Sequence, residues 1–192
     1  VGENGAGQST LMKMLNGLYE PTSGEIYYKG EQIKIDTPSI AAKTGIGMVY
    51  QHFMLIDTLT VAENMVLGFE PKSFGVFRKD KARQDVIEVA GKYGLNINPD
   101  SKVGDLSVGI QQRIEILKIL FKGAELLIFD EPSAVLTPQE VKELYQIMRN
   151  LVKEGKTIIF ITHKLQEVLD VSDNITVIRK GKNAGSIKTS EA

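Results

Sequence analysis

The chain has 192 residues, of which 42% are hydrophobic and 24% are charged, as expected of a single globular domain. Its formal net charge of −1 gives no overall basic field of the kind that gathers nucleic acid, so we expect no nucleic-acid partner. The absence of cysteine excludes disulfides and thiolate metal sites, and no apolar stretch reaches the roughly 18 to 20 residues of a membrane-spanning helix.

A glycine-rich stretch opens the sequence. Residues 2–10 read GENGAGQST and match the phosphate-loop pattern G-x-x-x-x-G-K-[ST] everywhere except at the lysine, which is Gln8. Glycines let consecutive backbone N–H groups surround phosphate oxygens, and Ser9 stands where a hydroxyl can reach Mg²⁺. The alternative is a glycine-rich turn before an ordinary helix. The candidate phosphate-binding residues are Gly2, Glu3, Asn4, Gly5, Ala6, Gly7, Gln8, Ser9 and Thr10.

Gln8 removes a positive charge from this loop. A glutamine donates a neutral hydrogen bond, which contributes about 1 kcal/mol, whereas a charge-assisted bond contributes about 1.5 to 3 kcal/mol. We therefore expect weaker nucleotide binding and a larger loss in phosphoryl transfer. Three origins remain open: an engineered or sequencing change, a site that binds without hydrolysing, and a naturally degenerate site.

The first third of the chain predicts a helix followed by short strands. Residues 9–18 carry an apolar stripe at helical spacing, and a Pro-Thr-Ser-Gly turn follows them. Residues 26–28 and 33–35 have β-type composition and are separated by Lys29-Gly30-Glu31, which predicts a hairpin. Residues 45–50 predict another short strand.

From about residue 60 to residue 123 the pattern becomes helical. Val86, Val89 and Ala90 mark one apolar stripe, and a second stripe begins at Ile110. We expect a helical subdomain here, inserted into an α/β core formed by residues 1–59 and 124–192.

Two continuous apolar runs, 126–129 and 157–161, predict parallel strands buried on both faces. The helix between them is marked by a capping box, in which Thr137 and Glu140 flank a proline at the first helical position. A last strand is expected at 175–178. Strands that alternate with helices predict an α/β fold with a parallel sheet.

The apolar run 126–129 ends in two acids. Asp130 is placed to hold a metal ion, and Glu131 is placed to orient or deprotonate a water molecule. Acids at a strand end also occur simply as solubilising termini. The pair by itself does not distinguish a catalytic site from such a polar strand end.

A second phosphate-facing helix end is predicted at residues 106–113, which read LSVGIQQR. Ser107 can cap a helix, and Gly109 allows the backbone to approach an anion closely. Two molecules facing head to tail could therefore sandwich one nucleotide. The segment resembles the signature motif of ABC transporter ATP-binding cassettes, with Val108 and Ile110 in place of the common Gly and Gln. The residues of this motif are Leu106, Ser107, Val108, Gly109, Ile110 and Gln111.

The resemblance implies roles for further residues. Gln51 resembles the glutamine that touches Mg²⁺ and water and senses the membrane partner; a surface-loop glutamine is the alternative. His163 resembles the switch histidine at the γ-phosphate; a structural histidine is the alternative. Residues 133–137 correspond to the D-loop, with Thr137 in place of its Asp. The implied catalytic residues are thus Glu131, His163 and Gln51, and the implied Mg²⁺ ligands are Ser9, Gln51 and Asp130.

Residues 48–55, 106–109, 134–140 and 161–165 are similar to the cassettes of simple-sugar and, more closely, nucleoside importers. This resemblance implies a P-loop NTPase fold and an importer subunit that binds and hydrolyses Mg-ATP at the cytoplasmic face of the membrane. Its implied partners are transmembrane permease subunits, a second cassette arranged head to tail and, indirectly, an extracytoplasmic substrate-binding protein.

The resemblance also implies that the chain is a fragment. A phosphate loop normally follows a buried strand, so we expect the strand before Gly2 to be missing, together with a second cassette beyond the C-terminal end. Two other functions remain open: a nucleotide-responsive binding module in which Gln8 disables turnover, and a soluble ABC ATPase without a transporter.

Overall fold

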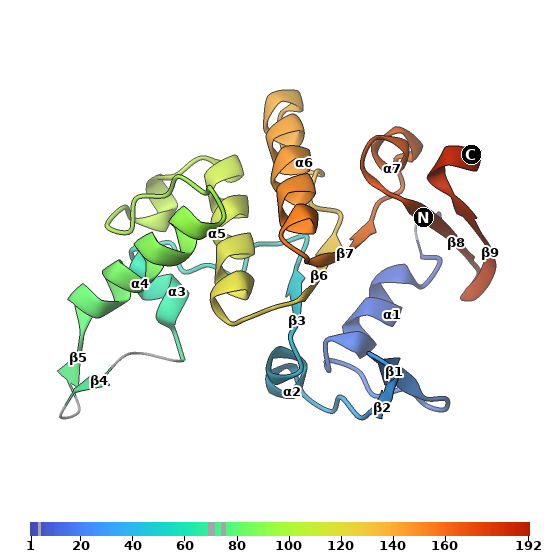
Figure 1. The fold of residues 1–192 in the computed structure, drawn as a ribbon, viewed down its shortest axis with the longest axis horizontal. Coiled ribbons are helices and arrows are strands. Elements are labelled where there is room, and N and C mark those ends of the chain that lie inside the picture. Colours follow the sequence, from blue (N-terminus) through green and yellow to red (C-terminus); the bar gives the residue numbers. More distant parts are fainter. Residues whose placement is uncertain (4, 69–71, 74–75) are drawn as a thin grey trace.

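The computed structural model describes residues 1–3, 5–68, 72–73 and 76–192 (Figure 1). Its helices are α1 (Gln8–Leu15), α2 (Pro38–Lys43), α3 (Val61–Val66), α4 (Lys79–Lys92), α5 (Val108–Phe121), α6 (Pro138–Lys153) and α7 (Leu165–Val171), with 3-10 turns at Val103–Asp105 and Thr189–Glu191. Its strands are β1 (Ile26–Tyr28), β2 (Glu31–Ile33), β3 (Ile46–Val49), β4 (Lys72–Ser73), β5 (Val76–Phe77), β6 (Leu126–Asp130), β7 (Thr157–Ile161), β8 (Asn174–Arg179) and β9 (Lys182–Lys188).

A three-stranded parallel sheet with the order β3-β6-β7 forms the centre of the fold. Every residue of β6 is buried, because this strand is paired on both edges and covered on both faces. Successive side chains of a strand point to opposite faces. Leu127 and Phe129 accordingly join a core that includes α3 to α6, whereas Leu126 and Ile128 pack with residues of α1 and α2. The prediction of an α/β fold with a parallel sheet is confirmed.

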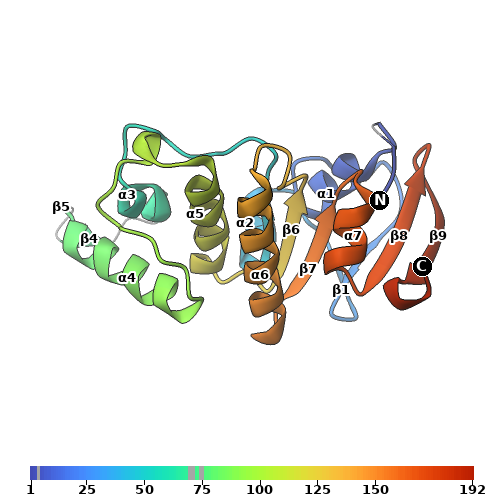
Figure 2. The ribbon, with the colours of Figure 1, turned by 90° about the horizontal axis from the view of Figure 1, so that it is seen from above.

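Helices lie on both sides of this sheet (Figures 1 and 2). α6 follows β6 and leads into β7, and its start is the predicted capping box. The Thr137 backbone N–H donates to Glu140 Oε2 at 2.9 Å, and the Glu140 N–H donates to Thr137 Oγ1 at 3.4 Å. Gly155 follows the helix with φ of 81°, which is the left-handed conformation that glycine adopts readily after a helix.

The helical region between residues 60 and 123 contains α3, α4 and α5, as predicted, together with the short strands β4 and β5, which were not predicted. Its side chains share one core with the sheet: Val86 of α4 and Ile114 of α5 belong to the same buried cluster as Phe129 of β6. Gly47 of β3 makes room for α5, since an added Cβ would lie 2.8 Å from Ile119 Cβ. None of the helices in the described part of the chain is long and apolar enough to cross a membrane.

The N-terminal boundaries differ from the predicted ones. The helix expected at 9–18 begins at Gln8 and ends at Leu15, because the chain turns at Gly17 with φ of 72°. In the hairpin, Tyr28 pairs with Glu31, so the loop contains only two residues, both with positive φ. The second strand is therefore 31–33 and not 33–35. The helix α2 was not predicted, although Thr37 caps it and a proline occupies its first position.

The expected last strand does not extend the parallel series. β8 covers the predicted residues 175–178, but it pairs antiparallel with β9, which was not predicted. Within the described residues, β8 belongs to a separate two-stranded sheet. The start of the chain lies against it: the Val1 amino group donates to the Thr176 carbonyl at 2.8 Å, and the Ile178 N–H donates to the Val1 carbonyl at 2.8 Å.

Candidate functional site

The candidate residues of the sheet follow the carboxyl ends of its strands. Gln51 comes two residues after β3, Asp130 ends β6 and Glu131 follows it, and His163 comes two residues after β7. The parallel register pairs Val49 with Phe129 and Asp130 with Ile161, so these positions lie at one edge of the sheet. This edge is where open α/β sheets bind their ligands.

Backbone contacts fasten the glycine-rich loop to β8 and to the turn that follows it. Gly5 and Gly7 have φ of 79° and 100°, and the Leu11 N–H donates to the Gly7 carbonyl at the start of α1. The Gly181 N–H donates to the Ala6 carbonyl at 2.9 Å, which fastens the loop to the turn between β8 and β9. Gly2 approaches β8 so closely that an added Cβ would lie 2.3 Å from the Ile178 carbonyl oxygen. Asn4, another candidate, lies outside the described residues.

Gln8 occupies the first helical position after the loop. Its side-chain nitrogen Nε2 is buried and has no hydrogen-bonding partner among the described residues. The same atom lies next to Gly2, 2.9 Å from where a Cβ would stand. A buried amide nitrogen without a partner is unfavourable, so a hydrogen bond to a ligand oxygen would stabilise it. It brings no charge to that oxygen. Glu3 and Thr10 are exposed at either end of the loop.

Ser9 and Asp130 meet although they are far apart in sequence. Ser9 Oγ donates to Asp130 Oδ1 at 2.9 Å, and Asp130 is only 6% exposed. Burial raises the pKa of the Asp130 carboxyl, the Ser9 hydrogen bond opposes this effect, and the neighbouring Glu131 charge adds to it. A cation at this position would relieve both the burial and the repulsion. The oxygen atoms of Ser9 and Asp130 are also the kind of ligand that Mg²⁺ prefers.

The described residues include no group of three or more His, Cys, Asp or Glu side chains that could hold a metal ion. Mg²⁺ is usually held by one or two protein ligands together with water and substrate phosphates. Gln51 is exposed beyond β3, and its side chain has no hydrogen-bonding partner among the described residues. The structure therefore brings Ser9 and Asp130 into contact and places Gln51 at the same edge, exposed to solvent.

Glu131 and His163 form a second contact at this edge. His163 Nδ1 lies 3.2 Å from Glu131 Oε1, and both side chains are accessible to solvent. Glu131 has φ of 48°, which is uncommon for a residue other than glycine, and its N–H donates to the Ile161 carbonyl at 3.0 Å. Uncommon backbone conformations of this kind are maintained by the surrounding structure, and they are found most often at functional sites.

The signature segment lies elsewhere in the molecule. It begins α5, and α5 and α1 lie on opposite sides of α6 (Figures 1 and 2). Ser107 Oγ accepts from the Ile110 N–H at 3.4 Å, as expected of a cap, and Gln111 Nε2 donates to the Leu106 carbonyl at 3.0 Å. Ser107 and Val108 are exposed. One chain therefore does not bring this helix end to its own glycine-rich loop.

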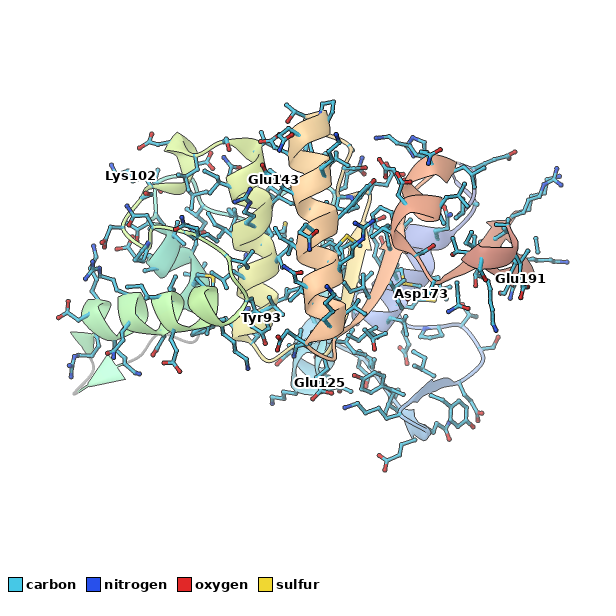
Figure 3. The ribbon with its side chains drawn as sticks, turned by 45° about the horizontal axis from the view of Figure 1, so that its top comes forward. Tyr93, Lys102, Glu125, Glu143, Asp173 and Glu191 are labelled. Atoms are coloured by element: carbon cyan, nitrogen blue, oxygen red, sulfur yellow. The ribbon has the colours of Figure 1, made fainter. Side chains whose placement is uncertain are left out.

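The sequence did not reveal a carboxylate at this helix end. Glu140 Oε1 accepts from the Gly109 N–H at 3.1 Å, while Oε2 serves the Thr137 cap. Hydrogen bonds from the Thr137 backbone and hydroxyl are the main cause that lowers the pKa of Glu140, and the Gly109 N–H contributes further. Glu143, one turn later on α6, lies beside α5 and pairs with Arg113 (Figure 3). Only the capping box was visible in the sequence, because the contact with Gly109 requires the packing of two helices.

Gly109→Ala is expected to weaken this contact. The added Cβ would lie 2.4 Å from Glu140 Oε1, so the carboxylate must leave the Gly109 N–H. We expect the urea concentration at the midpoint of unfolding to fall, because a helix-end hydrogen bond is lost. Gly91→Ala on α4 is the matched control, since nothing lies within 4 Å of its added Cβ, and it should be neutral or stabilising. Equal stability of both variants would contradict the prediction.

Comparisons with known proteins bear on this arrangement. The family model described as ABC transporter matches residues 1–134. The guanosine import ATP-binding protein NupO of Bacillus subtilis is 61% identical over 182 residues, which are 95% of this chain and 36% of that protein. The nucleoside import ATP-binding protein NupA of Lactococcus lactis is 55% identical over 188 residues, or 98% of this chain and 37% of that protein. The chain thus spans little more than a third of the length of these relatives.

Solved structures resemble the fold over the whole chain. CbiO1 of Clostridium perfringens, part of an ABC transporter complex, is 29% identical with a TM-score of 0.82 and is covered over 76% of its length. An ATP-binding cassette of an ABC transporter in its ADP conformation is 24% identical with a TM-score of 0.86 and is covered over 79% of its length; at that identity it supports the fold alone. Both comparisons cover 100% of this chain.

Proposed function

The chain belongs to the ABC transporter family, and from this premise we propose that it is an ATP-binding cassette that hydrolyses ATP to energise the import of a nucleoside or a simple sugar. The observation that carries the proposal is the pair of contacts at one sheet edge, Ser9 with Asp130 and Glu131 with His163. The cargo class rests on the relatives, which are named for import of guanosine, nucleosides and ribose.

In the proposed site the backbone N–H groups around Gly5 and Gly7 bind the phosphates, and Gln8 adds a neutral donor. Ser9 and Asp130 would hold Mg²⁺, and Gln51 would be a further ligand at the same edge. Mg²⁺ supplies charge neutralisation on the phosphate oxygens. The buried setting of Asp130 supports this role, because burial raises the pKa of its carboxyl and a bound cation would favour the charged form.

Glu131 is the proposed general base. Its accessible carboxylate accepts the proton of the attacking water, and His163 holds this carboxylate in place while its ring lies near the γ-phosphate. The 3.2 Å contact between His163 Nδ1 and Glu131 Oε1 supports this pairing, because a general base must be held in the correct orientation toward the water molecule.

A second cassette completes the site in this proposal. Ser107 and Gly109 lie at the start of α5, on the other side of α6 from α1 and the glycine-rich loop, so this helix end suits the phosphate of a nucleotide held by a partner. The helical region 60–123 passes the resulting motion to transmembrane permease subunits at the cytoplasmic face. An extracytoplasmic binding protein delivers the cargo to them.

One observation favours a second candidate, a binding cassette that does not turn over. Gln8 places a buried neutral amide where a lysine charge would act on the phosphates. In that case the partner cassette performs the hydrolysis and this chain responds to ATP by closing.

The two candidates differ in reconstituted complexes. With permease and binding protein in proteoliposomes, we expect ATP-dependent uptake of labelled guanosine that excess ribose does not compete away. Uptake that persists after Glu131→Gln in this chain would favour the non-hydrolysing cassette. If neither labelled guanosine nor labelled ribose is taken up in an ATP-dependent manner while ATP binding is retained, the importer function is contradicted.

A further inference from the structure

A buried carboxylate contacts the two loops that carry the proposed catalytic pair, Glu131 and His163. Glu167, on α7, is 8% exposed and is not accounted for by the site described above. Its oxygens accept from Ser133 Oγ at 2.7 and 2.8 Å and from Thr162 Oγ1 at 2.9 Å. Lys164 Nζ lies 3.0 Å from its Oε1 and compensates its charge.

The two hydroxyl groups belong to the two segments that carry the catalytic pair. Ser133 comes two residues after Glu131, and Thr162 immediately precedes His163. Ser133 is 4% exposed and Thr162 is 2% exposed, so both residues are shielded from bulk water. The Glu167 carboxylate therefore joins the two loops that carry Glu131 and His163. The side chains of these two residues meet, with His163 Nδ1 3.2 Å from Glu131 Oε1.

A carboxylate suits this junction better than other side chains of its size. It accepts hydrogen bonds only, through two oxygens, and both hydroxyls can therefore donate to it at the same time. Burying its charge is costly, and apolar residues of similar volume often stabilise a fold as well or better. Stability alone thus does not account for a charged residue here, whereas fixing the relative position of two loops does.

We propose that Glu167 is a positioning residue for hydrolysis, which holds His163 against Glu131 by fastening Thr162 to Ser133. This inference rests on the proposed ATPase function. Glu167 is expected to contact neither nucleotide nor water, and it acts through the geometry of the other two side chains.

The test is steady-state hydrolysis in the reconstituted transport complex. Glu167→Ala should lower kcat by about 10- to 100-fold, the loss that small misplacements of catalytic groups cause, while KM for ATP changes by less than about 3-fold. Glu167→Gln should restore most of kcat, because its amide can accept from one hydroxyl and donate to the other. On a His163→Ala background, Glu167→Ala should cost little more, since residues that act through one another are not additive.

Controls separate positioning from folding. Asp170→Asn removes an exposed carboxylate from the same helix, where it accepts from Gln166 Nε2, and should leave kcat unchanged. Thr162→Val removes one donor while keeping the shape, so it should reproduce the kcat loss even where Glu167→Ala does not fold. Wild-type kcat in Glu167→Ala or Thr162→Val, or losses that multiply with His163→Ala, would overturn the inference alone. An unsubstituted complex without ATPase activity would contradict the proposed function and this inference with it.

Discussion

Glu131→Gln is expected to lower ATP hydrolysis by about 10²- to 10⁴-fold, the contribution typical of a positioned general base. The substitution keeps the size of the side chain and the hydrogen bond with His163, but its amide cannot accept the proton of water. ATP binding should persist, because Glu131 does not belong to the glycine-rich loop. Single-turnover hydrolysis of radiolabelled ATP, measured beside equilibrium binding, checks both parts.

Glu154→Gln is the matched control for this variant. Glu154 caps the end of α6 and is exposed, so the same chemical change there should leave the rate unaltered. A Glu131→Gln protein that hydrolyses ATP at the unsubstituted rate in a single turnover would show that Glu131 is not the base, and would favour turnover by the partner cassette.

Much of the central fold could be predicted because its signals are local. The apolar run 157–161 and the capping box of Thr137 and Glu140 each occupy a few consecutive residues, and the structure places a strand and a helix start there. The run 126–129 gave β6 except for Asp130, whose polar side chain hides its place at the strand end.

The errors occur where contacts distant in sequence decide the structure. The series of strands was expected to end with 175–178 in the parallel sheet, but β8 instead pairs with β9, whose residues are all exposed and carry no apolar pattern. The hairpin register depends on the two-residue turn at Lys29 and Gly30. Because this turn is shorter than predicted, the second strand begins two residues earlier than expected.

The candidate site shows the same division. Motifs in the sequence singled out Ser9, Asp130 and Glu131, and the family resemblance added His163. The structure brings these four residues together as two contacting pairs. The role of Glu140 at Gly109 was not visible, because it depends on how α6 packs against α5. Glu167 was missed for a similar reason: Ser133, 34 residues earlier in the chain, is one of its partners.

Gln8→Lys is expected to tighten ATP binding by about 5- to 30-fold, the difference of about 1 to 2 kcal/mol between neutral and charge-assisted hydrogen bonds to phosphate. The effect on kcat should be larger, on the order of 10²-fold, because charge builds up on the transferred phosphoryl group in the transition state. Titration calorimetry with Mg-ATP and single-turnover hydrolysis measure the two effects separately.

Two further variants show which property of residue 8 matters. Gln146→Lys makes the same substitution on the exposed surface of α6 and controls for a general gain of positive charge. Gln8→Met removes the amide and keeps the length of the side chain; it should weaken binding by about 5-fold if the buried Nε2 donates to phosphate, the contribution of one neutral hydrogen bond. If Gln8→Lys raises neither affinity nor rate while Gln8→Met lowers affinity, the loop is built around the neutral amide, and the cassette that binds without turning over becomes the better account of this chain.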